Sequence, residues 1–477
     1  MKHKHFMFAL LAMLLSFGSP TFAQKVAKIG NTEYATLNEA MTEANKAAGN
    51  YTITLLQNSA EVFTFAQKSG VNITVDGDGN TFSGKITLNA GGGNLTFTDA
   101  KIAPANSQTI VLNVSTAPNV TFDGCTLQGA NKSGAIIYGN ASATSNKLTV
   151  KNCTADNLQY IVSHRQTGAN SVLVENVTAS NMTYLVRTLK CPSVTVKNVT
   201  VHDAAIGIEI KNDGAGGKLT LEDVNINIVT YGGSLYNPVN GSGAGKDWTI
   251  TTKGENTFSA NGVAYEDNSW FSGNAGYTIV DGNPVKVGEK TYATLAKAVA
   301  AAQTGETVTL LKDATGAGVV INKNVTIDFD GKTYSFNEGV GSTGTESNGF
   351  QILKGTNVVL KNGTLKVAEG AAQKFYILVQ NYADNLTVED MTLDGTFLDK
   401  WSKTDQDSYV LSNNSGNVIV KGNTNITANN DGDKAFAFDV CDKTANGYTA
   451  PVVNIETTGK IAGKIEVSAS IPSNLKI

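Results

Sequence analysis

The sequence predicts an all-β solenoid, in which short parallel strands stack in coils around a shared apolar core. The main observation is a recurring segment: two apolar residues flank a polar one, then comes a charged residue or Thr, then usually Gly, Asn or Asp. Its copies start about 22 to 35 residues apart, a period typical of coiled repeat proteins. A second observation is internal duplication, because the opening of the chain reappears near residue 285. The clearest copies of the segment lie at 120–124, 148–152, 172–176, 194–198 and 219–223.

The first 23 residues predict an export signal. Lys2 and Lys4 precede an apolar run from Phe6 to Phe17, and a small residue, Ala23, follows shortly after. This run is too short to span a membrane, and no later segment is apolar enough to do so. We therefore expect cleavage after Ala23 and a protein that is secreted, periplasmic or displayed at the cell surface.

Two modules follow, each opened by a short helix. Tyr34–Leu37 and Tyr292–Leu295 share the sequence Tyr-Ala-Thr-Leu, and each leads into apolar residues at helical spacing. Thr36 and Glu39 have the spacing of a capping box. The helix is expected to close one end of each solenoid, where a strand edge and the core would otherwise be exposed. The predicted organisation is a first module at 24–252, a connection at 253–284 and a second module at 285–477.

Two columns of side chains emerge when the coils are aligned. One column holds charged residues of alternating sign. The column that follows it contains Gly, Asn or Asp in most coils, and these residues tolerate a left-handed backbone. We therefore expect a sharp bend there in each coil. In the charged column, opposite charges on neighbouring parallel strands attract, so the alternation indicates the strand register. The charged column reads Asp123, Lys151, Glu175, Lys197 and Glu222 in the first module, and Asp328, Lys361, Glu389, Lys421 and Glu456 in the second.

The bend column carries a resemblance to a known family. Asn152, Asn176 and Asn198 are similar to the asparagine stack in the short turn of the right-handed parallel β-helix proteins, the pectate-lyase-like superfamily. The resemblance covers most of 50–250 and 307–460 and implies a right-handed parallel β-helix in two tandem modules. The repeated opening also resembles modules of secreted bacterial surface proteins. The superfamily includes lyases, hydrolases, tailspikes and adhesins, so the resemblance implies a fold rather than one activity.

The motifs of the family's polygalacturonase-like hydrolases, such as Asn-Thr-Asp and Gly-His-Gly, are absent. The few Arg and His residues beyond the leader nevertheless cluster in sequence, and they provide catalytic candidates. Arg165, Arg187 and Lys190 could hold the carboxylate of an acidic sugar. Glu209 or His202 could then serve as acid or base. The alternative is that Arg187 and Glu209 form a surface ion pair without a catalytic role.

Aromatic residues in two less regular segments are candidates for ligand binding. Tyr265 and Trp270 lie in the connection, and Trp401 and Tyr409 lie in an insertion of the second module. Loops on a rigid solenoid commonly carry binding sites, and aromatic faces suit sugar rings. The alternative is that these side chains pack against the core.

Composition narrows the function further. A formal net charge of −4, with 16% charged residues, argues against binding to nucleic acid. Four cysteines are too few for a disulfide scaffold, and Cys125 and Cys153, equivalent in consecutive coils, are either stacked buried thiols or a disulfide. No metal-ligand spacing or cofactor motif is found, so neither a metal nor a cofactor is expected.

The sequence favours an exported, non-enzymatic protein that binds an extracellular glycan or acts as an adhesin. The alternative is a lyase or hydrolase of acidic polysaccharides.

Overall fold

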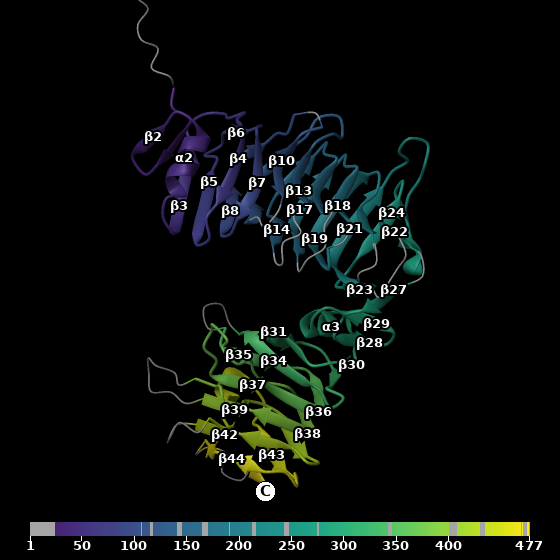
Figure 1. Ribbon diagram of the computed structural model, residues 1–477. Coiled ribbons are helices and arrows are strands. Elements are labelled where there is room, and N and C mark those ends of the chain that lie inside the picture. Colours follow the sequence, from purple (N-terminus) through teal and green to yellow (C-terminus); the bar gives the residue numbers. More distant parts are fainter. Residues whose placement is uncertain are drawn as a thin grey trace, which may run out of the picture. The chain divides into compact units, whose positions relative to one another are not determined.

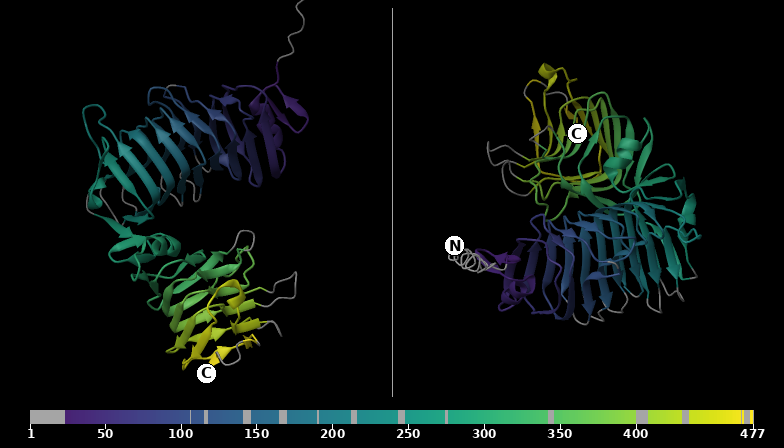
Figure 2. Two further views of the ribbon diagram at one scale, coloured as in Figure 1. Left: turned by 180° about the vertical axis from the view of Figure 1, so that it is seen from behind. Right: turned by 90° about the horizontal axis from the view of Figure 1, so that it is seen from above.

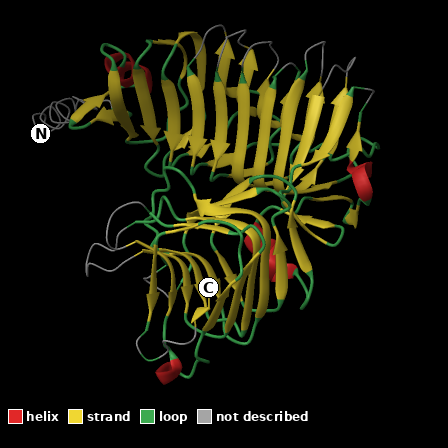
Figure 3. Ribbon diagram, turned by 90° about the horizontal axis from the view of Figure 1, so that it is seen from below, coloured by secondary structure: helices red, strands yellow, loops and turns green. Residues whose placement is uncertain are grey.

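The computed structural model describes two compact units. The first unit contains Met1–Thr252 and Asn256–Val280, and the second contains Lys253–Glu255 and Asp281–Ile477. Strands, yellow in Figure 3, make up most of each unit and confirm the predicted all-β solenoid. The predicted leader at 1–23 lies outside the described residues. The described residues are 24–476 without 106, 115–117, 141–145, 165–169, 190, 212–215, 243–247, 274–275, 342–345, 400–407, 430–434, 469 and 471–474.

Two long sheets form the first unit, and their strands follow one another from purple to teal in Figure 1. Almost all neighbouring strands are parallel, as expected when each coil adds one strand to each sheet. Sheet 1B has nine strands: β4 (Val62–Gln67), β7 (Lys85–Gly91), β10 (Thr109–Val114), β13 (Ala135–Asn140), β16 (Tyr160–His164), β18 (Tyr184–Thr188), β20 (Ile208–Lys211), β22 (Val239–Ser242) and β26 (Phe271–Ser272). Sheet 1A has 18 strands: β1 (Ala27–Ile29), β2 (Thr32–Tyr34), β3 (Gly49–Leu55), β5 (Val71–Asp76), β6 (Thr81–Phe82), β8 (Asn94–Thr98), β9 (Lys101–Ile102), β11 (Asn119–Asp123), β12 (Thr126–Gln128), β14 (Lys147–Lys151), β15 (Thr154–Asp156), β17 (Ser171–Ser180), β19 (Ser193–Ala204), β21 (Gly217–Ile228), β23 (Trp248–Lys253), β24 (Thr257–Ala260), β25 (Val263–Ala264) and β27 (Tyr277–Asp281).

The second unit repeats this plan with fewer coils, and Figure 2 shows the stacked strands of each unit from two further sides. Sheet 2B has six strands: β32 (Val319–Ile321), β35 (Asn348–Ile352), β37 (Ile377–Asn381), β39 (Ser408–Asn413), β42 (Ala435–Val440) and β45 (Lys464–Val467). Sheet 2A has 13 strands: β28 (Val285–Val287), β29 (Lys290–Tyr292), β30 (Thr307–Leu310), β31 (Ala314–Ala317), β33 (Val325–Asp328), β34 (Thr333–Glu338), β36 (Asn357–Val367), β38 (Asn385–Asp394), β40 (Asn417–Lys421), β41 (Asn425–Thr427), β43 (Val452–Ile455), β44 (Ile461–Ala462) and β46 (Leu475–Lys476).

A short α-helix opens each unit, as predicted. Helix α2 (Leu37–Ala44) begins after Thr36, whose hydroxyl accepts a hydrogen bond from the Glu39 N–H at 3.0 Å. Helix α3 (Leu295–Ala301) begins in the same way after Thr294. Each helix packs its apolar face on the first strands of its unit, so it covers the core at that end. Two short 3₁₀ helices complete the inventory of described helices: η1 (Asp267–Trp270) and η2 (Thr444–Asn446).

Each unit has its own continuous apolar core inside the coils. In the first unit, the rings of Phe97 and Phe122 stack with centroids 4.8 Å apart, and Phe82 lies on the other side of Phe97 at 5.7 Å. Cys125 and Cys153 are buried in this core as free thiols, and the Cys125 N–H donates to the Cys153 Sγ at 3.3 Å. Equivalent core side chains from successive coils therefore lie on one another.

The segment 253–284, predicted as a connection, contains further strands. Strands β24 and β26 add to sheets 1A and 1B of the first unit. Trp270 is 5% exposed and stacks on Phe258 with ring centroids 4.5 Å apart. Much of this segment therefore packs as a further coil on the first core.

The alternating charges form the predicted rows, one on sheet 1A and a separate one on sheet 2A. Lys151 lies in register between Asp123 and Glu175, and Lys197 lies between Glu175 and Glu222. Since equivalent residues of successive coils lie side by side, the aligned columns of the sequence are confirmed as rows in space. The Nζ–carboxylate distances are 3.0 Å for Lys151–Asp123, 3.2 Å for Lys197–Glu222, 3.2 Å for Lys361–Asp328 and 3.3 Å for Lys421–Glu389.

Reversing one charge in this row tests its contribution to stability. Lys197→Glu would place three carboxylates side by side, so we expect a loss of about 1 kcal/mol of unfolding free energy at low salt. The loss should shrink at high salt, because these side chains are partly exposed. Denaturant midpoints at two salt concentrations measure it. Lys218→Glu is the matched control, since Lys218 is exposed and lies opposite Ser193; equal losses in both variants would contradict the proposed attraction.

The bend column behaves as its residue types predict. Asn152, Asn176 and Asn198 have φ angles of 54°, 53° and 48°. The Asn176 amide donates to the Asn152 Oδ1 at 2.9 Å, and the Asn198 amide donates to the Asn176 Oδ1 at 2.8 Å. The asparagine stack implied by the family resemblance is therefore present.

In an early coil of each unit the bend lies one residue later. After Gly77 the left-handed residues are Asp78 and Gly79, with φ of 47° and 76°. After Phe329 they are Asp330 and Gly331, with φ of 46° and 74°. This displacement explains how a bulky, fully buried Phe329 can occupy a column that otherwise contains small polar residues.

Candidate functional site

Two tyrosines stand side by side on the outside of sheet 1B. Tyr160 and Tyr184 are the first residues of β16 and β18 and are in register, with ring centroids 5.3 Å apart and planes 16° apart. Both are partly exposed, whereas the residues that follow them, Ile161 and Leu185, are buried in the core. The neighbouring position on the preceding coil is Ala135, whose side chain is only a methyl group. The pair therefore forms a rigid aromatic surface that ends beside a small residue.

Arg187 contacts both tyrosines of this pair. Its guanidinium carbon lies 5.4 Å from the centre of the Tyr184 ring, and its Nη1 donates to the Tyr160 hydroxyl at 3.3 Å. Its Nε donates to a Glu209 carboxylate oxygen in a close ion pair between adjacent strands. The surface ion pair that the sequence offered as an alternative is therefore present, and it also braces the two tyrosines.

The charge of the Arg187 guanidinium limits the chemistry that this residue can perform. Burial acts to lower the pKa of Arg187, but Glu209 and the Tyr160 hydroxyl outweigh burial and raise this pKa above its ordinary value. Arg187 is therefore a permanent cation already paired with a carboxylate. It can donate hydrogen bonds to a ligand, but it is a poor candidate for the base of a polysaccharide lyase.

The remaining catalytic candidates do not gather around Arg187 in the described structure. His202 lies on β19 of sheet 1A, exposed and opposite Ser180, whereas Arg187 and Glu209 lie on sheet 1B. Arg165 and Lys190 lie outside the described residues. His164 is buried inside the coil, where desolvation lowers its pKa to about 4. That histidine is therefore neutral at physiological pH and faces the core.

The loop between β21 and β22 carries further exposed apolar residues, two of them aromatic. Tyr231, Leu235 and Tyr236 are 46%, 50% and 41% exposed. The loop ends at Pro238, whose oxygen accepts a hydrogen bond from the Ile208 N–H at 2.9 Å, one coil beyond Tyr184. Burial and Glu209 are the main causes that raise the pKa of Tyr184. The ammonium of Lys132 lies 5.8 Å from the centre of the Tyr231 ring. The sequence analysis overlooked this loop; its only signal is two tyrosines in a turn rich in Gly and Ser.

The second unit has an aromatic pair at the equivalent place on sheet 2B. Tyr409 and Phe436 are in register on β39 and β42, with centroids 5.2 Å apart and planes 18° apart. In each unit a charged residue lies three positions after an aromatic residue of the pair. Arg187 lies three residues after Tyr184, and Asp439 lies three residues after Phe436. The Tyr409 hydroxyl donates to the Glu466 Oε2 at 2.8 Å. The two units thus share an aromatic pair but differ in charge.

The other predicted ligand-binding aromatics lie elsewhere. Trp270 is buried against Phe258, so its ring belongs to the core rather than to a ligand surface. Tyr265 is half-buried against the same core, and burial raises its pKa. Trp401 lies outside the described residues. Of these four residues, only Tyr409 belongs to a partly exposed aromatic pair in the described part of the chain.

Two other features are absent from the residues that the structure describes. No cluster of three or more His, Cys, Asp or Glu side chains there is arranged to hold a metal ion. Among the helices that can be described, none has the length and apolar character needed to cross a membrane.

Comparison with known families agrees with this architecture. Residues 84–261 match the family model described as "Right handed beta helix region". This range includes the tyrosine pair, Arg187, Glu209 and the loop with Tyr231 and Tyr236. No curated protein matches the chain.

Proposed function

We propose that this chain, a right-handed parallel β-helix protein, is an exported, non-enzymatic protein that binds glycan on the outside of sheet 1B. One observation carries the proposal: a partly exposed tyrosine pair is braced by Arg187, which contacts both tyrosines. Aromatic rings on a rigid scaffold bind sugar C–H faces with little loss of side-chain entropy. Export rests on the leader at 1–23.

Several features support glycan as the ligand class. Both tyrosines are partly exposed, and their neighbour on the preceding coil is the small residue Ala135, so an apolar sugar face can lie against the rings. The guanidinium of Arg187 and the tyrosine hydroxyls lie at the rim and could bond sugar oxygens. The loop with Tyr231 and Tyr236 exposes two further aromatic rings. The lyase or hydrolase alternative has less support, because His202 lies on the other sheet and Glu209 is already paired with Arg187.

Replacing Tyr160 tests the proposal. We expect Tyr160→Ala to weaken glycan binding by about tenfold or more, the effect of losing about 1.4 kcal/mol of contact energy. Tyr160→Phe should keep most of the binding, because the ring remains and only the hydroxyl is removed. The measurement is a glycan array with the full chain, followed by titration of the best ligand.

Tyr292→Ala serves as the control, since Tyr292 is a half-buried tyrosine in the β28–β29 hairpin of the second unit. Circular dichroism spectra of all variants check that the fold is kept. Glycan binding that survives Tyr160→Ala at full strength would refute the assigned surface. Release of unsaturated or reducing sugars from acidic polysaccharides would instead favour the enzyme alternative.

A further inference from the structure

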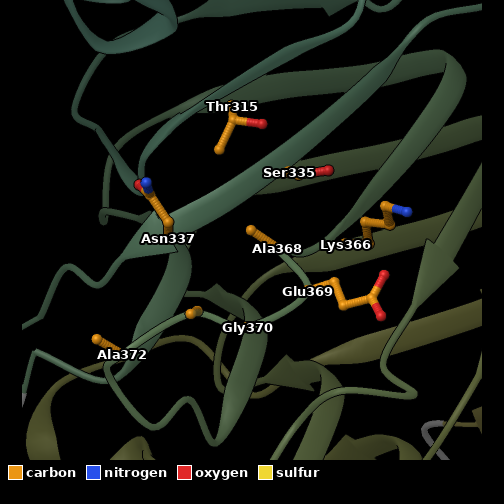
Figure 4. A pocket seen from close by; sticks show the side chains of 9 residues that line it. Thr315, Ser335, Asn337, Lys366, Ala368, Glu369, Gly370 and Ala372 are labelled. Atoms are coloured by element: carbon orange, nitrogen blue, oxygen red, sulfur yellow. The ribbon is translucent and has the colours of Figure 1, made fainter. Parts of the chain in front are cut away.

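The second unit contains a polar pocket on the outside of sheet 2A, apart from the aromatic pair on sheet 2B. The pocket has a volume of about 430 Å³, within the range of small-molecule sites. Thr315, Ser335 and Lys366 form one row across its floor, because these residues are in register on β31, β34 and β36. Figure 4 shows the polar ends of these side chains, together with the Glu369 carboxylate, projecting from the ribbon to one side. Donors and acceptors from three strands and a turn therefore converge on one space.

A β-bulge places the next polar group of the pocket. Gly316 pairs with Phe336, and Ala317 pairs with Glu338, so Asn337 is an extra residue in β34. A bulge of this kind redirects the extra side chain and is over-represented next to functional sites. Asn337 is exposed and lines the pocket. The irregularity thus adds an amide, a donor and an acceptor, to the lining of the pocket, and Figure 4 shows its polar end turned to the side opposite the row.

A tight turn after β36 forms the wall. The Ala371 N–H donates to the Ala368 oxygen at 3.2 Å, and Gly370 has a left-handed φ of 71°, which a bulkier residue would adopt only with strain. The turn presents alanine methyl groups and the exposed Glu369 to the pocket. The pocket therefore combines a small apolar wall with hydroxyl, amide, ammonium and carboxylate groups.

We infer that this pocket binds a single neutral hexose unit of a glycan, an inference that takes its ligand class from the proposed function. The lining holds one cation, Lys366, and one anion, Glu369, so it has no net charge. The neighbour of Lys366 on the next strand is Asp394, whose Oδ1 accepts bonds from the Thr396 N–H and hydroxyl. The carboxylate of Asp394 would repel the carboxylate of an acidic sugar. A carboxylate and an amide can each bind neighbouring hydroxyls of a pyranose, and the alanine wall suits its C–H face.

The test uses the full chain and simple sugars. Methyl glycosides of glucose, galactose and mannose represent neutral hexoses, glucuronic acid represents acidic sugars, and glucosamine represents cationic ones. Saturation-transfer NMR detects the weak binding expected of an open pocket, and titration gives the affinity. We expect at least one neutral glycoside to bind more tightly than both charged sugars. Asn337→Ala and Glu369→Gln should each weaken this binding at least fivefold.

Glu289→Gln is the matched control, because Glu289 is an exposed residue in the turn between β28 and β29 and loses the same charge; it should leave the affinity unchanged. Unchanged affinity in both pocket variants, or a preference for a charged sugar, would overturn the inference. If Tyr160→Ala abolishes binding of the monosaccharide while the pocket variants keep it, the inference fails but the proposed function stands. If the chain binds no glycan on the array and no monosaccharide, both fail.

Discussion

Replacing Phe97 with Ala is expected to lower the unfolding free energy of the first unit by about 3–5 kcal/mol. Phe97 is fully buried and lies in the middle of the ring stack between Phe82 and Phe122. Its loss removes buried apolar area, leaves a cavity inside the coil and breaks two ring contacts. A close-packed core that stacks along one axis cannot refill such a cavity without shifting the neighbouring coils.

The damage should be local, because each coil of a solenoid contacts mainly its neighbours. Hydrogen exchange followed by mass spectrometry is the suitable measurement. Protection should fall most in β5, β8 and β11, which carry or adjoin the ring stack, and much less in β19 and β21. Phe397→Ala is the control, because Phe397 is 47% exposed and its removal should change stability by less than about 0.5 kcal/mol. A uniform loss of protection across the first unit would contradict the coil-by-coil account.

Replacing Asp439 with Asn is expected to remove a pH dependence of stability from the second unit. Asp439 is 6% exposed on β42, and burial is the main cause that raises its pKa to about 7. Its carboxylate accepts bonds from the Asn413 N–H at 2.6 Å and the Ser412 hydroxyl at 3.3 Å. Glu466 raises the pKa further, while Lys443 lowers it. A carboxyl group is therefore kept protonated well above its ordinary range.

The sign of the effect follows from proton counting. The unfolded chain releases this proton near pH 3.8, the ordinary value, whereas the folded unit holds it until about pH 7. Between these values the folded unit binds more protons, so the unfolding free energy falls as pH rises and stays low above pH 7. For a shift of this size the fall is on the order of 4 kcal/mol. The amide of Asn keeps the acceptor for Asn413 without a titrating proton.

Chemical denaturation of the full chain from pH 4 to pH 8, with hydrogen exchange to isolate the second unit, measures this effect. The unsubstituted chain should lose stability across the window, and Asp439→Asn should be nearly flat. Asp442→Asn is the control, because hydrogen bonds from Ser470 and Thr444 hold the pKa of partly exposed Asp442 at about 2. Its titration lies below the window, so the control should behave like the unsubstituted chain. A steep slope that persists in Asp439→Asn would contradict the assignment.

Much of the candidate site could be placed from the sequence, but its chemistry could not. Aligning the coils puts Tyr160 beside Tyr184 and Arg187 beside Glu209, and the structure has both pairs. The same alignment does not separate His202 from Arg187, because it gives no angle between the two sheets of a coil. The loop with Tyr236 was overlooked, since a loop outside the repeat has no equivalent in the neighbouring coils with which to align it.

The sequence by itself determined the repeating parts of this protein: the strands, the inward columns, the left-handed bends such as Asn176, the charged rows and the capping helices. These features depend on residue spacing and on the next coil, so a period in the letters becomes a row in space. Only the tertiary structure decided the burial of Asp439, the bulge at Asn337 and the pocket beside it. Each of these depends on packing between groups far apart in the chain rather than on local pattern.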